Sequence, residues 1–234
     1  MNETLSNYPK KPQESLLELQ FQESELEKIF EDENFSSEKL IALLEKQYPG
    51  VYKQDTDVWE GYTLKQHTLM VMEQFEKYFS DKTLPANINK DNFRLILALH
   101  DIGKPEAIAK EGKHFQHKYT QQYIQKLFGE LKIDKKHTDL ALALTSEDPI
   151  GKYIANKANA IDTKTAIENM AIEAGISTED FFELLCIYYK SDAGSYTENA
   201  EGLRSLDDLF EFDEENRKLD FSSRVQNKID QLGF

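Results

Sequence analysis

The sequence predicts an all-α fold. Apolar residues recur three and four positions apart in most of the long segments, which is the spacing of one face of a helix. Alternation of apolar and polar residues, the mark of a strand, is scarce, and two segments begin with serine–acid patterns typical of helix starts. Hydrophobic residues make up 39% of the 234 residues and charged residues 30%, a composition that supports a packed core.

The N-terminal part is predicted to be helical over residues 14–47. The stretches "SLLELQ", "LEKIF" and "EKLIALLEKQ" carry its apolar spacing, and "SSEK" at 36–39 marks the start of the last helix there. Residues 1–13, which contain two prolines, are expected to be a loose tail. Residues 48–62 form an irregular connector rich in aromatic side chains.

Four later segments each carry an apolar stripe at helical spacing: 62–79, 91–101, 117–131 and 177–194. In each segment one polar residue occupies a position of the stripe. Because residues three and four apart share a helix face, these polar side chains should point toward the core. They are His67, His100, His117 and Asp192.

The domain organisation follows from these segments. We expect residues 1–56 to form an N-terminal tail and helical extension, and residues 57–200 to form the main helical domain. Residues 201–234 should add a C-terminal helix and loop segment that packs on it, so that the whole chain is one structural unit.

Charge and cysteine content exclude several classes of protein. The formal net charge is −15, and the first 60 residues alone hold 14 acidic side chains and six lysines, so generic nucleic-acid binding is not expected. The single cysteine, Cys186, cannot form an intrachain disulfide or a cysteine-rich zinc cage. No apolar stretch approaches the ~20 residues of a membrane span, and no secretory signal is recognisable, so we expect no membrane association and a cytoplasmic location.

Several buried polar residues on separate helices need a common partner. A single buried histidine can be satisfied by one hydrogen bond, but a buried carboxylate without a partner is very costly. A metal ion is the economical common partner for such residues. Imidazole and carboxylate ligands suit a divalent ion such as Mn, Mg, Co, Ni, Zn or Fe.

His67, the pair His100–Asp101 and Asp192, in this order, resemble the motif H…HD…D of the HD-domain metal-dependent phosphohydrolase superfamily, which lies on a bundle of helices. The resemblance implies that these four residues bind the metal ion. Here 33 residues separate His67 from His100, and 91 separate Asp101 from Asp192, both ordinary gaps for that superfamily. The resemblance covers roughly residues 62–195. It implies an HD-type helical bundle with an N-terminal helical extension.

The stretch "HDIGKP", followed by "HFQHKYTQQY", is especially similar to the HD domains of bacterial CCA-adding tRNA nucleotidyltransferases. In that comparison Phe115 and His117 take the places of a phenylalanine and a histidine two residues apart. "HDIGK" also resembles the cyclic-dinucleotide phosphodiesterases of the HD-GYP group. We expect no nucleotidyltransferase domain upstream, and the sequence shows no GYP signature, so neither specific activity is implied.

At two further positions near the predicted metal site, this chain differs from relatives in the HD superfamily. Relatives with two metal ions often carry another histidine after the third helix, where this chain has "TSEDPIG" and offers Glu147 or Asp148. Some deoxynucleotide-cleaving relatives place a glutamate three residues after the HD pair, where this chain has Lys104. We therefore expect one ion, while His117 could complete a second site with Glu147 or Asp148.

The expected function is hydrolysis of a phosphate ester in a nucleotide or another small phosphorylated metabolite. Gly103 and Pro105 should end the helix that carries His100 and Asp101, which leaves the ion at a helix end open to substrate. Asp101 would also orient the attacking water, and Lys104 and His117 would hold the phosphate.

Two alternatives remain. The first is a mixed-valent di-iron oxygenase on the same scaffold, which would need six full ligands. The second is a non-enzymatic module with a vestigial HD site, in which the acidic N-terminal helices could bind a protein partner.

Overall fold

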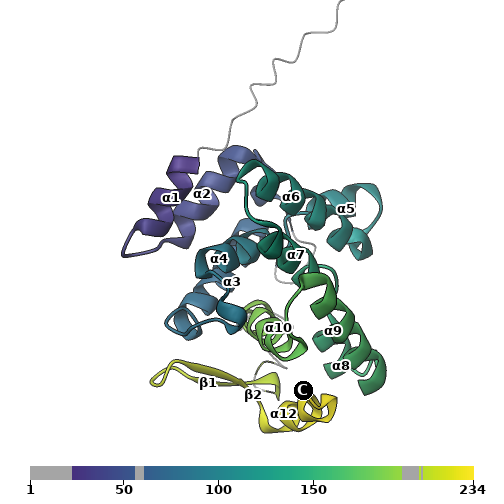
Figure 1. Ribbon diagram of the computed structural model, residues 1–234. Helices are drawn as coiled ribbons and strands as arrows, with labels where there is room; N and C mark the ends of the chain where they lie inside the picture. Colours follow the sequence, from purple (N-terminus) through teal and green to yellow (C-terminus); the bar gives the residue numbers. More distant parts are fainter. Residues whose placement is uncertain (1–22, 56–60, 197–205, 207) are drawn as a thin grey trace, which may run out of the picture.

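Residues 23–55, 61–196, 206 and 208–234 are described by the computed structural model. Over these residues the chain consists of α-helices and one short two-stranded hairpin, which confirms the prediction of an all-α fold (Figure 1). The predicted tail and the predicted domain boundaries after residues 56 and 200 lie outside the described residues, so those boundaries stay predictions.

Two N-terminal helices, α1 (Glu23–Glu31) and α2 (Ser37–Gln47), pack against each other. The hydroxyl of Ser36 accepts a hydrogen bond from the Lys39 backbone N–H, so α2 begins at the predicted position. Leu40, Ile41 and Leu44 on α2 are completely buried, and α2 packs against α3.

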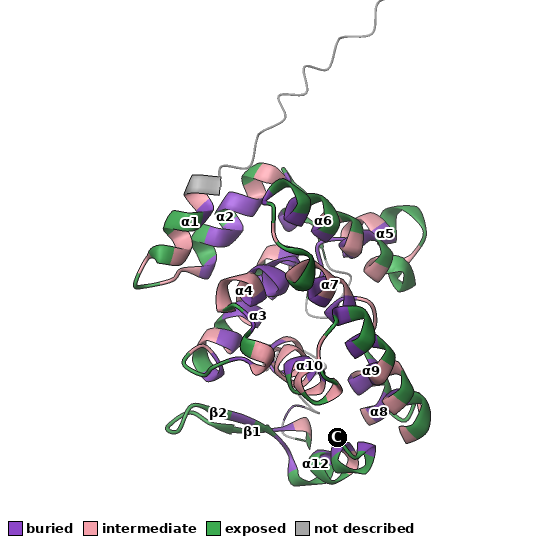
Figure 2. Cartoon of the chain, viewed as in Figure 1, coloured by how far each residue is buried: buried purple, intermediate pink, exposed green. Residues whose placement is uncertain are grey.

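The centre of the molecule is formed by α3 (Leu64–Tyr78), α4 (Lys90–Leu99) and α10 (Thr178–Ala193). Helix α3 packs against both of the others, and the rings of Phe75 on α3 and Phe93 on α4 lie 5.2 Å apart between centroids. All three helices carry buried residues, which Figure 2 colours purple. The stripes predicted for these segments are therefore core faces.

A second group of helices flanks this centre: α5 (Lys104–Lys110), α6 (Gln116–Glu130), α7 (Lys135–Leu144), α8 (Pro149–Ile154) and α9 (Ala160–Ala174). Helix α6 packs on α5 and α7, and α9 packs on α7 and α10. Short 3₁₀ turns lie at η1 (Val51–Lys53), η2 (Pro85–Asn87), η3 (Lys113–Phe115) and η4 (Asp230–Leu232).

The turn between α4 and α5 differs from the sequence prediction, in which Gly103 and Pro105 end the helix that carries His100 and Asp101. Helix α4 ends at Leu99, one residue before the HD pair, and Pro105 lies in the first turn of α5 instead of ending a helix. Proline is favoured in a first turn because the N–H that it lacks has no partner there. Gly103 is needed for a different reason: a Cβ atom at this position would lie 2.1 Å from the Thr120 backbone nitrogen on α6.

The sequence predicted a helix and a loop for the C-terminal segment, but this segment also contains two strands. Strands β1 (Phe210–Asp213) and β2 (Lys218–Phe221) form an antiparallel hairpin, followed by α12 (Ser223–Ile229). Each strand has only four residues, too few to show a clear alternation in sequence. The hairpin is held by buried Phe210 and Phe221, whose rings lie 6.1 Å from the ring of Tyr189 on α10.

No helix among the described residues is both long enough and apolar enough to cross a bilayer.

The close contact at Gly103 generates a stability prediction. We expect Gly103→Ala to destabilise the protein by about 2–3 kcal/mol, because the added methyl group must displace the backbone of α6. Gly129→Ala is the matched control: Gly129 lies in α6 with open space around it, so the exchange should be neutral or stabilise by about 0.5 kcal/mol. Urea unfolding of both variants measures the difference, and equal stabilities would contradict the packing argument.

Candidate metal centre

The four predicted metal ligands come from three helices of the central group. His67 lies in the first turns of α3, whose start is fixed by a capping box between Thr63 and Gln66. His100 and Asp101 follow the last residue of α4, and Asp192 lies in the last turn of α10.

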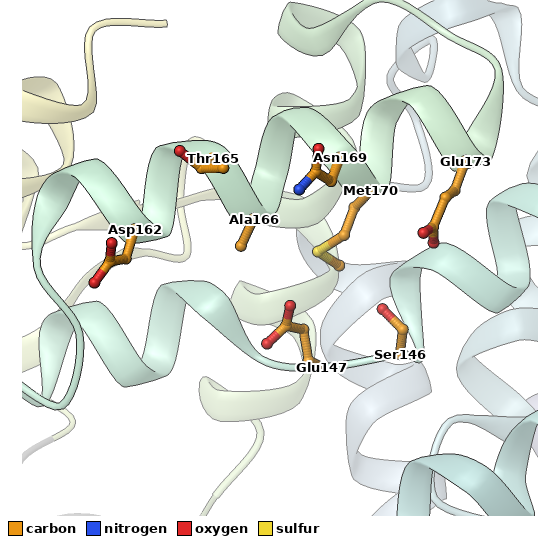
Figure 3. A pocket seen from close by; sticks show the side chains of 8 residues that line it. All are labelled: Ser146, Glu147, Asp162, Thr165, Ala166, Asn169, Met170 and Glu173. Carbon is orange, nitrogen blue, oxygen red and sulfur yellow. The ribbon is translucent and has the colours of Figure 1, made fainter.

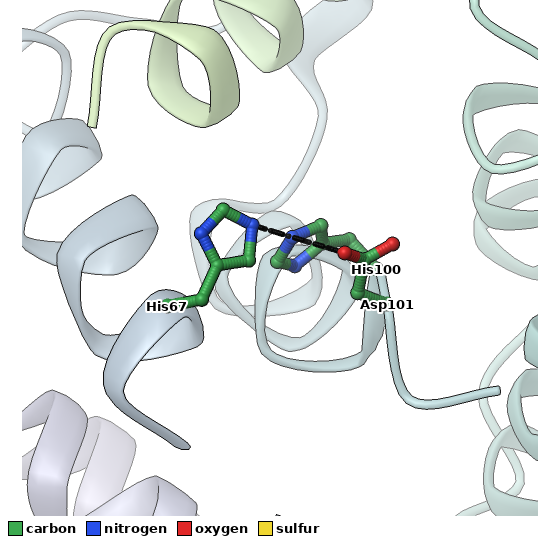
Figure 4. Close-up of side chains that lie close together, drawn as sticks. All are labelled: His67, His100 and Asp101. Carbon is green, nitrogen blue, oxygen red and sulfur yellow. Dashed lines mark hydrogen bonds and ion pairs between the residues drawn. The ribbon is translucent and has the colours of Figure 1, made fainter. Parts of the chain in front are cut away.

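The side chains of His67, His100 and Asp101 converge (Figure 4), and Asp192 lies close to both histidines. The Nε2 atom of His67 lies 3.2 Å from Nε2 of His100, 3.2 Å from Oδ1 of Asp192 and 3.8 Å from Oδ2 of Asp101. Nε2 of His100 lies 3.9 Å from the same Asp101 oxygen and 3.8 Å from the Asp192 oxygen. Two ligands that each lie ~2.1 Å from one ion at neighbouring positions are separated by ~3.0–3.5 Å, so a single ion fits this set with small adjustments.

Unsatisfied polar atoms support the assignment. Oδ1 of Asp192 is buried and accepts no hydrogen bond from the described residues, although it faces both histidines. A buried carboxylate oxygen without a donor is unfavourable, and a cation between these groups would remove the deficit. The donor set, two imidazoles and two carboxylates, suits a divalent transition metal.

The ring of His100 is oriented for ligation. Its Nδ1 lies 2.7 Å from the backbone carbonyl oxygen of Leu97, an acceptor only, so Nδ1 carries the proton and donates it there. Nε2 of the neutral ring then presents a lone pair to the centre, which is the usual arrangement of a metal-binding histidine. Burial lowers the pKa of His100, which favours this neutral form.

The two histidines differ in their electrostatic surroundings. Burial alone would lower the pKa of His67, but Asp192 and Asp101 outweigh it and raise that pKa. Burial likewise would raise the pKa of Asp101, yet Lys104 and the two histidines hold it below its ordinary value. Asp101 is therefore a carboxylate, the form that binds a cation.

Lys104 lies elsewhere than expected. Its side chain is 4% exposed, and its Nζ lies 2.9 Å from Oδ2 of Asp101. It does not line the pocket beside the centre. Lys104 thus contacts a predicted metal ligand and not the space where a phosphate would lie.

That pocket has a volume of about 130 Å³ and contains the other predicted site residue, His117. Nδ1 of His117 donates a hydrogen bond to the Thr145 backbone carbonyl at 2.9 Å, which fixes the ring as Leu97 fixes that of His100. The residues that line the pocket are His100, Asp101, Gln116, His117, Leu144, Glu147, Asp148, Leu185, Tyr188, Tyr189 and Asp192.

Sequence reasoning missed Tyr188 as a pocket residue. It lies one turn before Asp192 on α10, and its ring meets the ring of His100 edge-on at 6.4 Å. Burial raises the pKa of its hydroxyl well above the ordinary value, so the group is a neutral donor. Tyr188 precedes Asp192 by four residues, so the sequence could have indicated that both lie on one helix face. An aromatic residue on an apolar stripe, however, is more often only part of the core.

A second metal site is not assembled in the described part of the chain. His67, His100 and Asp101 are the one group of three there whose ligand atoms lie close together. Glu147 lies 2.7 Å from Lys152, and Oδ1 of Asp148 accepts a hydrogen bond from the Gly151 N–H at the start of α8. Both carboxylates line the pocket with His117, but each already has a partner.

We predict that His67→Ala lowers the metal affinity at least about 100-fold, because the variant removes one of the four ligands. His137→Ala is the matched control, since Nδ1 of His137 contacts only its neighbour Asp134, at 2.8 Å. Elemental analysis of both purified variants measures the effect. Equal metal content in His67→Ala, Asp101→Ala and the unaltered protein would contradict the assignment.

No protein-family model matches the chain, and neither a curated protein nor a solved structure matches it significantly. The relation to the HD superfamily therefore stays a resemblance that depends on the motif residues. The metal centre itself is supported by the convergence of His67, His100, Asp101 and Asp192 in the folded chain.

Proposed function

We propose that the protein is a metal-dependent phosphohydrolase that cleaves a phosphate ester of a nucleotide or another small phosphorylated metabolite. The observation that carries the proposal is a buried cluster of two imidazoles and two carboxylates at the base of a pocket that also holds His117. In the reaction a water oxygen bonds to phosphorus, the ester P–O bond breaks, and the leaving alcohol oxygen takes a proton.

His67, His100, Asp101 and Asp192 would hold the ion. When bound, a divalent ion makes water a better nucleophile and neutralises charge on the phosphoryl group. Asp101 and Asp192 stay ionised in the interior, because Lys104 and the histidines offset their charge, and each carboxylate can also accept a hydrogen bond from a water in the pocket.

The charge of the pocket makes the ion indispensable for this function. Among the residues that the structure describes, four carboxylates and no lysine or arginine line the pocket. A phosphate dianion would be repelled by such walls unless cationic charge were supplied at the centre. The proposal therefore requires strict dependence on a metal.

His117 is the side chain that we assign to the phosphate. Its Nδ1 proton is already donated to Thr145, so contact with a phosphate oxygen would use Nε2 of the protonated ring. Lys104 acts through Asp101 and not on the phosphate. Its ammonium group fixes the Asp101 carboxylate and offsets the charge of that group, which makes Lys104 a positioning residue.

The alternatives make different demands on the same residues. A di-iron oxygenase would need a second set of ligands, and a single set is assembled among the described residues. A vestigial site would be expected to have lost ligands, whereas all four are present and in contact. A partner that binds the acidic helix α1 is compatible with any of these functions.

The direct test is a screen of the purified protein against nucleotides and sugar phosphates with Mn, Mg, Co, Ni, Zn and Fe. We expect phosphate release that a chelator abolishes and that His67→Ala lacks. Oxygen consumption with a di-iron signal in electron paramagnetic resonance would instead support the oxygenase. Absence of bound metal would support the non-enzymatic module.

His117→Ala separates a phosphate contact from a metal ligand. If His117 contacts phosphate, the variant should keep its full metal content and lose about 100-fold in turnover, the size of a lost transition-state hydrogen bond. A drop from two bound ions to one would show that His117 is a ligand to a second ion. Retention of both metal and activity would remove His117 from the site.

A further inference from the structure

The metal pocket contains a buried hydrogen-bond acceptor without a donor. Oε1 of Gln116 is buried and accepts no hydrogen bond from any described residue. Gln116 is the first residue of α6 and directly precedes His117, and both residues line the pocket. A buried amide oxygen without a donor is unfavourable, so we expect a group that enters the pocket to donate a hydrogen bond to it.

The carboxylates of the pocket are engaged in other contacts. Two of them belong to the metal centre. Glu147, which also lines a wider groove along α9 (Figure 3), pairs with Lys152 at 2.7 Å. Asp148 accepts a hydrogen bond from a backbone N–H in the first turn of α8. The amide oxygen of Gln116 differs from these groups, because it is uncharged, buried and without a partner in the described part of the chain.

Tyr188 on α10 supplies a donor to the same pocket. Burial and the charge of Asp192 raise the pKa of its hydroxyl, which therefore keeps its proton, and its ring meets that of His100 at the edge of the metal centre. This hydroxyl forms no hydrogen bond with a described residue. Gln116 and Tyr188 thus offer one acceptor and one donor. A hydroxyl group of a ligand can use both at once, whereas a phosphate dianion can only accept.

The size of the pocket limits what can carry that hydroxyl group. Its volume is about 130 Å³, below the ~300–1,000 Å³ of pockets that enclose a drug-sized ligand. Leu144 and Leu185 add apolar surface against which a short carbon chain can pack. The pocket therefore suits a phosphoryl group with a short alcohol part and does not enclose a nucleoside.

We propose that Gln116 and Tyr188 are specificity-determining residues, and that the substrate is the monophosphate of a small polyol with a hydroxyl group on the carbon next to the ester carbon. The inference rests on the proposed phosphohydrolase function. With the phosphoryl group at the metal centre, this hydroxyl group donates to Oε1 of Gln116 and accepts from the hydroxyl of Tyr188. Nucleoside monophosphates should be poorer substrates, because their base and ribose stay outside the pocket.

The test compares two esters that differ in one hydroxyl group, glycerol 3-phosphate and 3-hydroxypropyl phosphate, with the metal ion that supports turnover. We expect kcat/KM to be about 10-fold to 100-fold higher for glycerol 3-phosphate, because the other ester leaves the acceptor and donor of the pocket unpaired. Equal kcat/KM values for the two esters would overturn the inference.

Gln116→Met removes the acceptor and keeps a side chain of similar length, so it should bring the ratio of the two kcat/KM values to about one. Tyr188→Phe keeps the ring beside His100 and should lower the ratio at least about threefold. Gln122→Met is the matched control: Gln122 is exposed on α6 and does not line the pocket, so the ratio of the unaltered protein should persist. A full ratio in both Gln116→Met and Tyr188→Phe would contradict the assignment.

Binding without turnover separates this inference from the proposed function. The phosphonates 3,4-dihydroxybutyl phosphonate and 4-hydroxybutyl phosphonate have a carbon in place of the ester oxygen and cannot be hydrolysed. Calorimetric titration of the metal-loaded protein should give a Kd at least about fivefold lower for the dihydroxy compound, and Gln116→Met should abolish this difference.

The two possible failures then have different signatures. If neither ester is cleaved but the dihydroxy phosphonate binds more tightly in a Gln116-dependent way, the hydroxyl site stands and the phosphohydrolase proposal fails. If both esters are cleaved with equal kcat/KM and both phosphonates bind equally, the phosphohydrolase stands and the hydroxyl site fails.

Discussion

The contact between the Gly103 backbone and helix α6 is the constraint on which the candidate site depends. The Gly103 N–H donates a hydrogen bond to Oγ1 of Thr120 at 3.1 Å, and the space left by the missing side chain lets the two backbones meet. Gly103 closes the turn that presents His100 and Asp101, and Thr120 lies one turn after His117. One packing contact therefore sets the position of the predicted metal ligands relative to the residue assigned to the phosphate.

Charge compensation is the second requirement of this site. Asp101 can stay ionised in the interior because Lys104 is buried with it, which leaves the carboxylate fixed and its charge largely offset. Among the described residues no lysine pairs with Asp192, whose charge is offset by His67 and His100. A buried carboxylate whose charge is only partly offset lowers the stability of the folded protein. A bound cation would offset the remaining charge.

The C-terminal hairpin supports the site indirectly. Its aromatic residues pack on Tyr189, next to Tyr188 in the pocket wall, and Leu219 approaches Gly194 at the end of α10. A Cβ atom at Gly194 would lie 3.2 Å from the Leu219 side chain, so this end of the helix is closely covered. Asp192 therefore lies in a turn of α10 whose outer side is held by residues more than 20 positions later in the chain.

The sequence by itself determined the all-α class, the start of α2, the core faces of α3, α4 and α10, and the polar positions within them. These features depend on spacing within one helix, which is local information. The tertiary structure alone decided that Lys104 pairs with Asp101, that Pro105 opens a helix, that Tyr188 enters the pocket and that a hairpin covers α10. It also placed α9 beside the turn that contains Glu147. The places of Tyr188, the hairpin and α9 depend on contacts between segments distant in the chain, and periodicity within a segment carries no information about which distant segment will face it. The pair of Lys104 with Asp101 and the helix start at Pro105 are local, but the residue pattern did not fix the direction of the lysine side chain or the side of the proline on which the helix lies.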